Sequence, residues 1–249
     1  MANNIYKPTL AKPLHRLAAF LIDAVAFVIL FTGVLYLASL IFDFDTHYAN
    51  LIEEYKKIGY YIYNETAKKW EYLSTEAENY KQVTELLLSN KVIEEELFFV
   101  NSFSVKAPLA STAIVLVILE FIIPLFLRNG ATLGMKVFHI GLISKNDLRI
   151  NPLQLFARCF IGKIAILGII PVLGILYIFL SPSGGLLGTL MVLLVYGIQA
   201  FLLITNQNKA GIQDIISSVY PVDANETMFY KNEKEKQQAS NQLSRSKGK

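Results

Sequence analysis

The sequence contains a single cysteine, and this scarcity excludes several kinds of site. Cys159 is alone among 249 residues, so the chain cannot form an intramolecular disulfide bond or a zinc site built from several cysteines. We expect it to be a small buried apolar residue. The three histidines, His15, His47 and His139, are far apart in sequence and lack the spacing of metal ligands. We therefore predict no bound metal and no cofactor.

Charged residues are also scarce, at 17% of the chain against the roughly 25% of an ordinary soluble domain. Hydrophobic residues make up 53% and are gathered into long uninterrupted runs, which is the pattern of membrane proteins. Basic residues do not alternate with aromatic ones, so we exclude a nucleic-acid partner. Phosphate-binding loops, dinucleotide fingerprints and nucleophile elbows are absent, so we predict that the protein is not an enzyme. The expected partner is the lipid bilayer.

Four apolar runs are long enough to cross a bilayer, which takes roughly 20 helical residues. They cover residues 17–42, 106–127, 155–180 and 186–204. The last two are joined by a short uncharged turn at 181–185 that is rich in serine and glycine. The fold class that we predict is an all-α membrane protein, a bundle of four transmembrane helices.

Residues 43–105, between the first two spans, form a polar insert rich in glutamate, lysine and tyrosine. The stretches 51–62 and 80–99 have the pattern of amphipathic helices. From 43 to 106 there are twelve acidic and seven basic residues, a net charge of −5. We predict a helical, acidic insert on the extracytoplasmic side.

The orientation follows from the basic residues that flank the spans, because such flanks stay in the cytoplasm during insertion. The N-terminal flank has Lys7, Lys12 and Arg16 and no acidic residue. The segment 128–163 has six basic residues against Asp147 alone. We therefore predict a multi-pass protein of the cell membrane with both termini in the cytoplasm.

The segment between the second and third spans is too polar to cross the membrane. Residues 135–144 alternate as in a strand, 145–147 resemble a turn, and 148–150 form a short returning strand, which predicts a cytoplasmic strand-like hairpin. Asn151 and Pro152 then provide a cap and a first position for the next helix. The C-terminal residues 223–249 are polar, and we predict that they form a disordered cytoplasmic tail.

Asp23 lies in the middle of the first span, where a carboxylate costs roughly 2.5 to 3.5 kcal/mol on insertion scales. It therefore needs a partner or water at its own depth. Arg16 lies on the same helix face but about 10 Å nearer the cytoplasm, and helical side chains lean toward the N-terminus. A direct bond between Arg16 and Asp23 would be strained.

Glu120 and Lys163 are expected at the depth of Asp23, and together the three residues form a candidate polar site with Arg158 in support. Pro124 cannot donate to the carbonyl of Glu120, which leaves a free oxygen beside this carboxylate. Such ligands suit a proton or a small cation such as sodium. Alternatively, Lys163 extends to the lipid headgroups, Glu120 is a protonated residue among helices, and Pro124 only kinks its helix.

Several short motifs resemble the RDD family, which is named for one arginine and two aspartates. The opening motif is Arg16-Leu-Ala-Ala-Phe-Leu-Ile-Asp23, the closing one is Gly211-Ile-Gln-Asp214, and residues 130–136 and 155–158 resemble the middle portion. The resemblance covers residues 13–222 apart from the insert. It implies a multi-pass membrane protein whose signature residues are Arg16, Asp23 and Asp214. The insert, and Gln213 where the family frequently has histidine, depart from the pattern.

The chemistry of the residues and the family resemblance lead to the same hypothesis. In this hypothesis, Asp214 docks at the cytoplasmic surface, where its carboxylate accepts from the planar guanidinium of Arg16. Transport has been proposed for some family members, and buried carboxylates often mark ion pathways. We therefore expect a transporter of a proton or small cation. The alternative is a scaffold or assembly partner that does not transport and binds another protein through the acidic insert.

Overall fold

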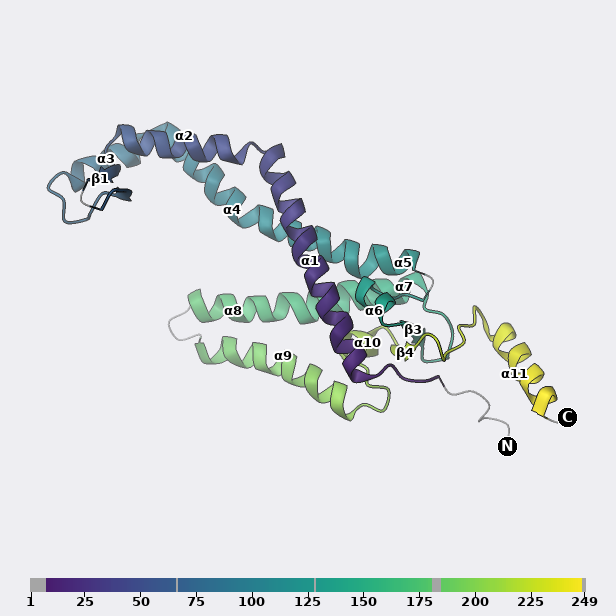
Figure 1. The fold of residues 1–249 in the computed structure, drawn as a ribbon. Coiled ribbons are helices and arrows are strands. Elements are labelled where there is room, and N and C mark those ends of the chain that lie inside the picture. The colour runs from purple at the N-terminus through teal and green to yellow at the C-terminus, as the bar shows by residue number, and fades with distance from the viewer. Residues whose placement is uncertain (1–7, 66, 128, 181–184, 248–249) are drawn as a thin grey trace. The chain divides into compact units, whose positions relative to one another are not determined.

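The computed structural model describes residues 8–65, 67–127, 129–180 and 185–247, and it is mostly helical (Figure 1). Four helical stretches in these residues are long and apolar enough to cross a membrane. They are Pro13–Ile41, Lys91–Phe126, Pro152–Ile175 and Gly185–Thr205. The four predicted spans are therefore confirmed as long apolar helices. Most of the predicted turn at 181–185 lies outside the described residues.

The chain divides into two compact units. The first unit comprises Met1–Val28 and Leu116–Lys249, and the second comprises Ile29–Val115. Helix α1 (Pro13–Ile41) contributes to both units, and so does α4 (Lys91–Val117). The motifs that resemble the RDD family all lie in the first unit, whereas the insert lies in the second.

The first unit contains most of the helical residues of the spans. Its elements after α1 are the π-helical turn η1 (Ile118–Ile122), α5 (Ile123–Phe126), α6 (Leu133–Val137), α7 (Pro152–Phe156), the π-helix η2 (Ala157–Ile169), α8 (Ile170–Leu180), α9 (Gly185–Thr205), α10 (Ile212–Ile216) and α11 (Glu233–Lys247). Helices α8 and α9 lie side by side (Figure 1). Gly174 and Gly188 meet there, and a Cβ on Gly188 would lie 2.3 Å from the carbonyl oxygen of Gly174. These two glycines therefore permit the close approach of the two helix backbones.

Helix α7 begins as the sequence predicts. Asn151 Oδ1 accepts from the backbone N–H of Gln154 at 2.7 Å, and the Gln154 side chain accepts from the backbone N–H of Asn151 at 3.1 Å. This capping box, with Pro152 at the first position, fixes the start of the third span.

A small sheet joins distant parts of the first unit and corrects the predicted hairpin. Strand β3 (Ile140–Ser144) pairs antiparallel with β4 (Val219–Asp223), with Ile140 opposite Asp223. The returning segment 148–150 makes two isolated bridges, one between Ile143 and Arg149 and one between Leu148 and Tyr230. All five residues of β3 are buried, so the strand needs an apolar partner, which β4 supplies and the short segment 148–150 does not.

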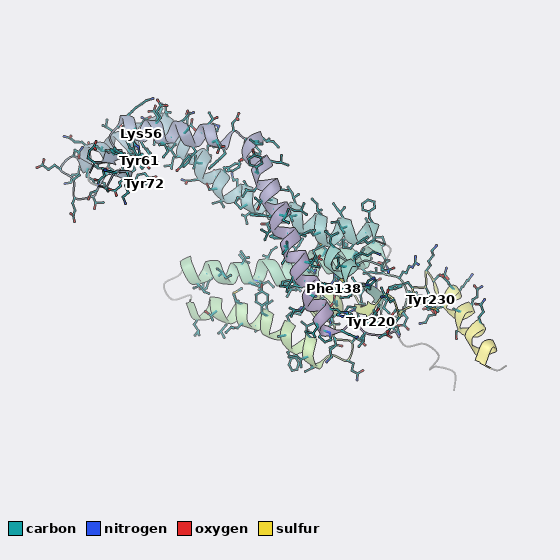
Figure 2. All side chains as sticks on the ribbon, viewed as in Figure 1. Lys56, Tyr61, Tyr72, Phe138, Tyr220 and Tyr230 are labelled. Atoms are coloured by element: carbon teal, nitrogen blue, oxygen red, sulfur yellow. The ribbon has the colours of Figure 1, made fainter. Side chains whose placement is uncertain are left out.

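Residues before β3 and after β4 also differ from the sequence-based expectation. Residues 133–137 are helical, because the Thr132 hydroxyl accepts from the N–H of Met135 at 3.3 Å and caps α6. Of the residues expected as a tail, Asp223 ends β4, the carbonyl of Tyr230 accepts from the N–H of Arg149 at 2.8 Å, and 233–247 form α11. Figure 2 shows Tyr220 and Tyr230 near this sheet.

The second unit combines helices with a strand pair. It contains α2 (Phe44–Lys57), β1 (Tyr61–Asn64), β2 (Lys69–Tyr72), α3 (Tyr80–Ser89) and most of α4. The predicted helix 80–99 is broken at Asn90, and α4 continues from the insert into the second span, so the predicted boundary at 106 lies inside a helix. The strand pair was not predicted.

The strand pair places four aromatic side chains on one face. Tyr61 lies opposite Tyr72 and Tyr63 opposite Trp70, and residues two apart share a face of a strand. The Lys56 ammonium lies 4.4 Å from the centre of the Trp70 ring, as expected for a cation–π contact. Figure 2 shows Lys56, Tyr61 and Tyr72 gathered at this end of the insert. Tyr63, Trp70 and Tyr72 are exposed, so the strand pair presents an aromatic face at the surface of the insert. The buried core of the insert consists of Leu51, Tyr55 and Ile93.

Candidate functional site

Asp214 is the centre of a buried ionic cluster in the first unit. It lies on the short helix α10, and its side chain is 1% exposed. Its Oδ1 accepts from Arg158 Nε at 2.8 Å, and its Oδ2 lies 3.7 Å from Arg16 Nη2 and accepts from the N–H of Gly211 at 3.2 Å. Arg16 also donates to the carbonyl of Lys209. Arg16 and Arg158, from two different spans, therefore hold α10 through one carboxylate.

A glycine explains how closely α10 approaches the third span. A Cβ on Gly162 of η2 would lie 2.5 Å from the Cα of Gln213, so only glycine fits at this position. Gln213 in turn accepts from the Gln199 side chain of α9 at 3.1 Å, and Gln199 accepts from the N–H of Ile212 at 2.8 Å. The family that the sequence resembles frequently has histidine at the position of Gln213. Here Gln213 forms a neutral hydrogen bond that joins α10 to α9.

Asp23 is bound by the segment that precedes β3 and not by another charged residue. Its Oδ2 accepts from the Thr132 hydroxyl at 2.5 Å, and its Oδ1 accepts from the N–H of Gly134 at 2.8 Å. A Cβ on Gly134 would lie 2.0 Å from the carbonyl oxygen of Ala19, so α6 packs directly on the backbone of α1. The carboxylate therefore caps the N-terminus of α6, where free N–H groups favour a negative charge.

Glu120 and Lys163 form a second ionic cluster together with Arg158. Lys163 Nζ and Glu120 Oε2 are in ion-pair contact, and Arg158 Nη1 lies 3.9 Å from the same oxygen. The Glu120 side chain is 13% exposed and that of Arg158 is 7% exposed. Neither Glu120 Oε2 nor Arg158 Nη1 makes a hydrogen bond of regular geometry among the described residues. Glu120 is thus held by two cations, with Lys163 in direct contact and Arg158 farther away.

The π-helical geometry of η2 brings the two cations to the same carboxylate. Arg158 and Lys163 are five residues apart, and both lie in η2. In an α-helix, positions five apart point about 140° away from each other, whereas i to i+5 bonding aligns them. Glu120 lies in η1, a π-helical turn that ends at Ile122, just ahead of Pro124. Single-turn π-helical segments are frequent at functional sites.

The structure joins some of the predicted residues in direct contacts and leaves others without one. Glu120 contacts Lys163, and Asp214 contacts Arg16, but no hydrogen bond or ion pair joins Asp23 to Glu120 or Lys163 among the described residues. Asp214 also binds Arg158, a pairing that the sequence reasoning missed. Thr132 and Gly134 were missed as partners of Asp23. Thr132 in the motif 130–136 is a residue type that caps helices, but nothing in the sequence signals that this cap contacts Asp23.

The fold and these clusters define a class of protein. Four long apolar helices, with arginine, lysine and carboxylate side chains buried among them and short elements docked at their ends, are the features of a helical multi-pass membrane protein.

Comparison with protein families identifies the family to which the chain belongs. The model of the RDD family matches residues 10–218, which is most of the chain, and the protein therefore belongs to the RDD family. A search of curated proteins and a search of solved structures each found no match. Arg16, Asp23 and Asp214 lie within the matched residues, and the insert is enclosed by them.

Proposed function

We propose that this protein exchanges a proton or a small monovalent cation across the cell membrane, with Glu120 as the ion-binding carboxylate. The observation that carries the proposal is the ionic cluster of Glu120, Lys163 and Arg158 among apolar spans, in which Glu120 Oε2 is buried and lacks a regular hydrogen bond among the described residues. Hard oxygen ligands of this kind accept protons and small cations.

Lys163 acts in this proposal as an internal counter-ion. Its side chain is 24% exposed, against 7% for Arg158, so Lys163 is the cation that can leave the cluster. When Lys163 withdraws, Glu120 loses its nearest cation and binds a proton or small cation in its place. When Lys163 returns, it displaces that ion. Arg158 stays in place because Asp214 also holds it.

Ion flux into proteoliposomes tests the proposal. A sodium gradient is imposed on vesicles that contain the full chain and an internal pH dye, and the Glu120→Gln and Lys163→Gln variants are measured beside it. Glu120→Gln should reduce flux to the level of protein-free vesicles. Lys163→Gln should alter the ion concentration for half-maximal flux. Glu85→Gln, which changes an exposed carboxylate of α3, serves as the matched control. Unchanged flux in a folded Glu120→Gln variant would contradict the proposal.

A second function is favoured by a different observation. Both oxygens of Asp23 and both of Asp214 are already bonded within the chain, as expected of residues that hold a structure together. A scaffold or assembly partner that does not transport, and that binds another protein through the acidic insert, needs only such structural carboxylates. In that case no ion gradient is dissipated by the wild type, and removing the β1 and β2 strands abolishes a co-purifying partner.

The proposed orientation places both termini in the cytoplasm and the insert outside the cell. The basic flanks of the first and third spans support it. Single cysteines introduced in place of Thr75 in the insert and Gln238 in α11, in a Cys159→Ser background, test it in intact cells. An impermeant maleimide should label the cysteine at 75 and not the one at 238. The reverse pattern would overturn the orientation while leaving the ion site untouched.

We also propose that the protein has no enzymatic activity, because the clusters described combine carboxylates with cations and offer no pairing of nucleophile with base.

A further inference from the structure

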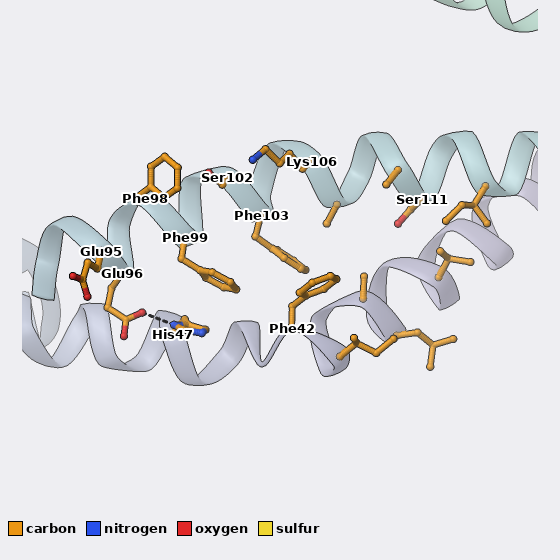
Figure 3. Close-up of a pocket in the computed structure, with 17 residues that line it drawn as sticks. Phe42, His47, Glu95, Glu96, Phe98, Phe99, Ser102, Phe103, Lys106 and Ser111 are labelled. Atoms are coloured by element: carbon orange, nitrogen blue, oxygen red, sulfur yellow. Dashed lines mark hydrogen bonds and ion pairs between the residues drawn. The ribbon is translucent and has the colours of Figure 1, made fainter.

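A cavity of about 900 Å³ in the second unit lies between α4 and the segment formed by the end of α1 and the start of α2. Its lining residues come from 34–41 of α1, from Phe42, from His47 of α2 and from 95–114 of α4. Figure 3 shows Phe42, Phe99, Phe103 and His47 directed into the space between these helices. Small residues, Ala38 on α1 and Ala107 and Ala110 on α4, leave the space open.

The cavity is elongated. Its lining extends along α4 from Glu95 to Ile114, which is about 28 Å at 1.5 Å per residue. A long and flexible molecule fits this shape.

The two ends of the cavity differ in chemistry. At one end the lining consists mostly of apolar residues of the predicted spans 17–42 and 106–127, among them Val34, Ala110 and Ile114, so this end faces the hydrocarbon of the bilayer. At the other end the acidic Glu96 is already paired, because His47 Nδ1 lies 2.6 Å from its Oε2 and Asn50 donates to its Oε1 at 3.2 Å. The cavity is therefore apolar where it meets lipid tails and polar where it leaves them.

One cation of the lining has no acidic partner among the described residues. Lys106 is exposed, forms no ion pair there, and lies four residues from Ser102 on the same side of α4. The other acid of the lining, Glu95, is eleven residues away, about 16 Å along the helix. A negative group beside Lys106 and Ser102 would thus be attracted without meeting strong repulsion.

We infer that this cavity is a binding site for a membrane phospholipid of net negative charge. One acyl chain lies between α1 and α4 along Ala38, Ala107 and Ala110, on the membrane side of Lys106, and the phosphate lies beside Lys106 and Ser102. The acyl chain accounts for the elongated apolar space that faces the bilayer. The lone cation accounts for a preference among headgroups. Neither the cluster at Glu120 nor ion exchange is required for this site.

Native mass spectrometry of the full chain tests the site. The protein is released from nanodiscs containing equal amounts of phosphatidylglycerol and phosphatidylcholine with identical acyl chains, and the lipids retained per chain are counted. The wild type should retain one phosphatidylglycerol in preference to phosphatidylcholine. Lys106→Gln should retain both lipids equally. Lys81→Gln, which removes an exposed lysine of α3 outside the lining, should behave as the wild type.

A second pair of variants tests the chain portion of the site. Ala110→Leu should fill the cavity and abolish retention, whereas Ala113→Leu, on the same helix but outside the lining, should leave retention unchanged. Equal retention by these two variants would overturn the inference, and so would an undiminished headgroup preference in Lys106→Gln. If Ala110→Leu does not fold, the Lys106→Gln comparison decides by itself.

Discussion

Asp23 illustrates how a charge inside a span is compensated without an opposite charge. Its two oxygens accept from the Thr132 hydroxyl and the Gly134 N–H, so the carboxylate serves as a cap for α6. The sequence predicted that Asp23 needs a partner at its own depth, and Thr132 and Gly134 meet that need. One of these partners is a backbone N–H, and no sequence pattern shows where such a group lies in space. The residue was recognisable, whereas its partners were not.

Replacing Asp23 should therefore affect folding more than any ion pathway. Asp23→Ala leaves two buried donors without an acceptor, at a cost of about 1 to 3 kcal/mol for each. Asp23→Asn keeps an oxygen for one of them and should lose less stability. Thermal unfolding of the purified protein in detergent measures the difference. An Asp23→Ala variant as stable as the wild type would show that the cap contributes nothing.

Gly134 offers a sharper test of the same contact. A Cβ there would lie 2.0 Å from the carbonyl oxygen of Ala19, a backbone atom that cannot move aside, whereas a Cβ on Gly33 of the same α1 helix would meet nothing within 4 Å. Overpacking of this kind costs typically about 1 to 3 kcal/mol. Gly134→Ala should lower the unfolding temperature, and Gly33→Ala, the matched control, should not. Similar effects of both substitutions would contradict this packing.

At the scale of elements, α10 is held by one carboxylate between two arginines. Asp214 bonds Arg158 of η2 and faces Arg16 of α1, so its removal leaves a buried arginine without compensation. Breaking a buried ion pair costs about 3 to 5 kcal/mol. Asp214→Ala should consequently destabilise the protein more than Arg16→Ala, because the Arg16 side chain is 20% exposed and can turn to water.

Exchanging the charges of the pair gives a further expectation. Combining Arg16→Asp with Asp214→Arg should fail to restore stability, because the new arginine would face Arg158. Rescue by the exchange, measured by thermal unfolding, would mean that Arg158 contributes little to the cluster.

The limits of sequence reasoning are clear at this scale. The spans, the cap at Asn151 and the polarity of the insert follow from composition and periodicity, which are local properties of the chain. The pairing of β3 with β4 and the π-helical form of η2 depend on contacts between distant residues. Arg158 was expected in support of Glu120 and Lys163, but its bond to Asp214 was not, because the two residues are 56 positions apart in the sequence. The strand pair of the insert was not predicted, because its aromatic residues lie inside an acidic segment with a helical pattern.

At the scale of the whole molecule, the sheet reaches beyond the residues that match the family. The match ends at residue 218, but β4 lies at Val219–Asp223. In addition, the N–H of Asp223 donates to the carbonyl of Thr9 at 2.8 Å, and that of Ala11 to the carbonyl of Pro221 at 3.3 Å. Strand β4 therefore bonds β3 along one edge and residues 9–11 along the other.

Truncation should reveal this dependence. A chain that ends at Asn232 loses α11 and the contact of Lys236 with Asp147 at 3.0 Å, a partly exposed pair worth about 0 to 1 kcal/mol. A chain that ends at Ser218 also loses β4 and uncovers the buried strand β3. The first should unfold at nearly the temperature of the full chain and the second far below it. Equal unfolding temperatures would show that β4 is dispensable.

The position of β4 also has a consequence for biosynthesis. Residues 9–11 leave the ribosome early, but the strand that they bond is made some 210 residues later. At a synthesis rate of about 5 to 20 residues per second, β4 is made roughly 10 to 40 seconds after residues 9–11. All four spans are synthesised during that interval, so the sheet can close only after the last span has been made. A nascent chain stalled before codon 219 would then carry an open edge that cellular surveillance can recognise.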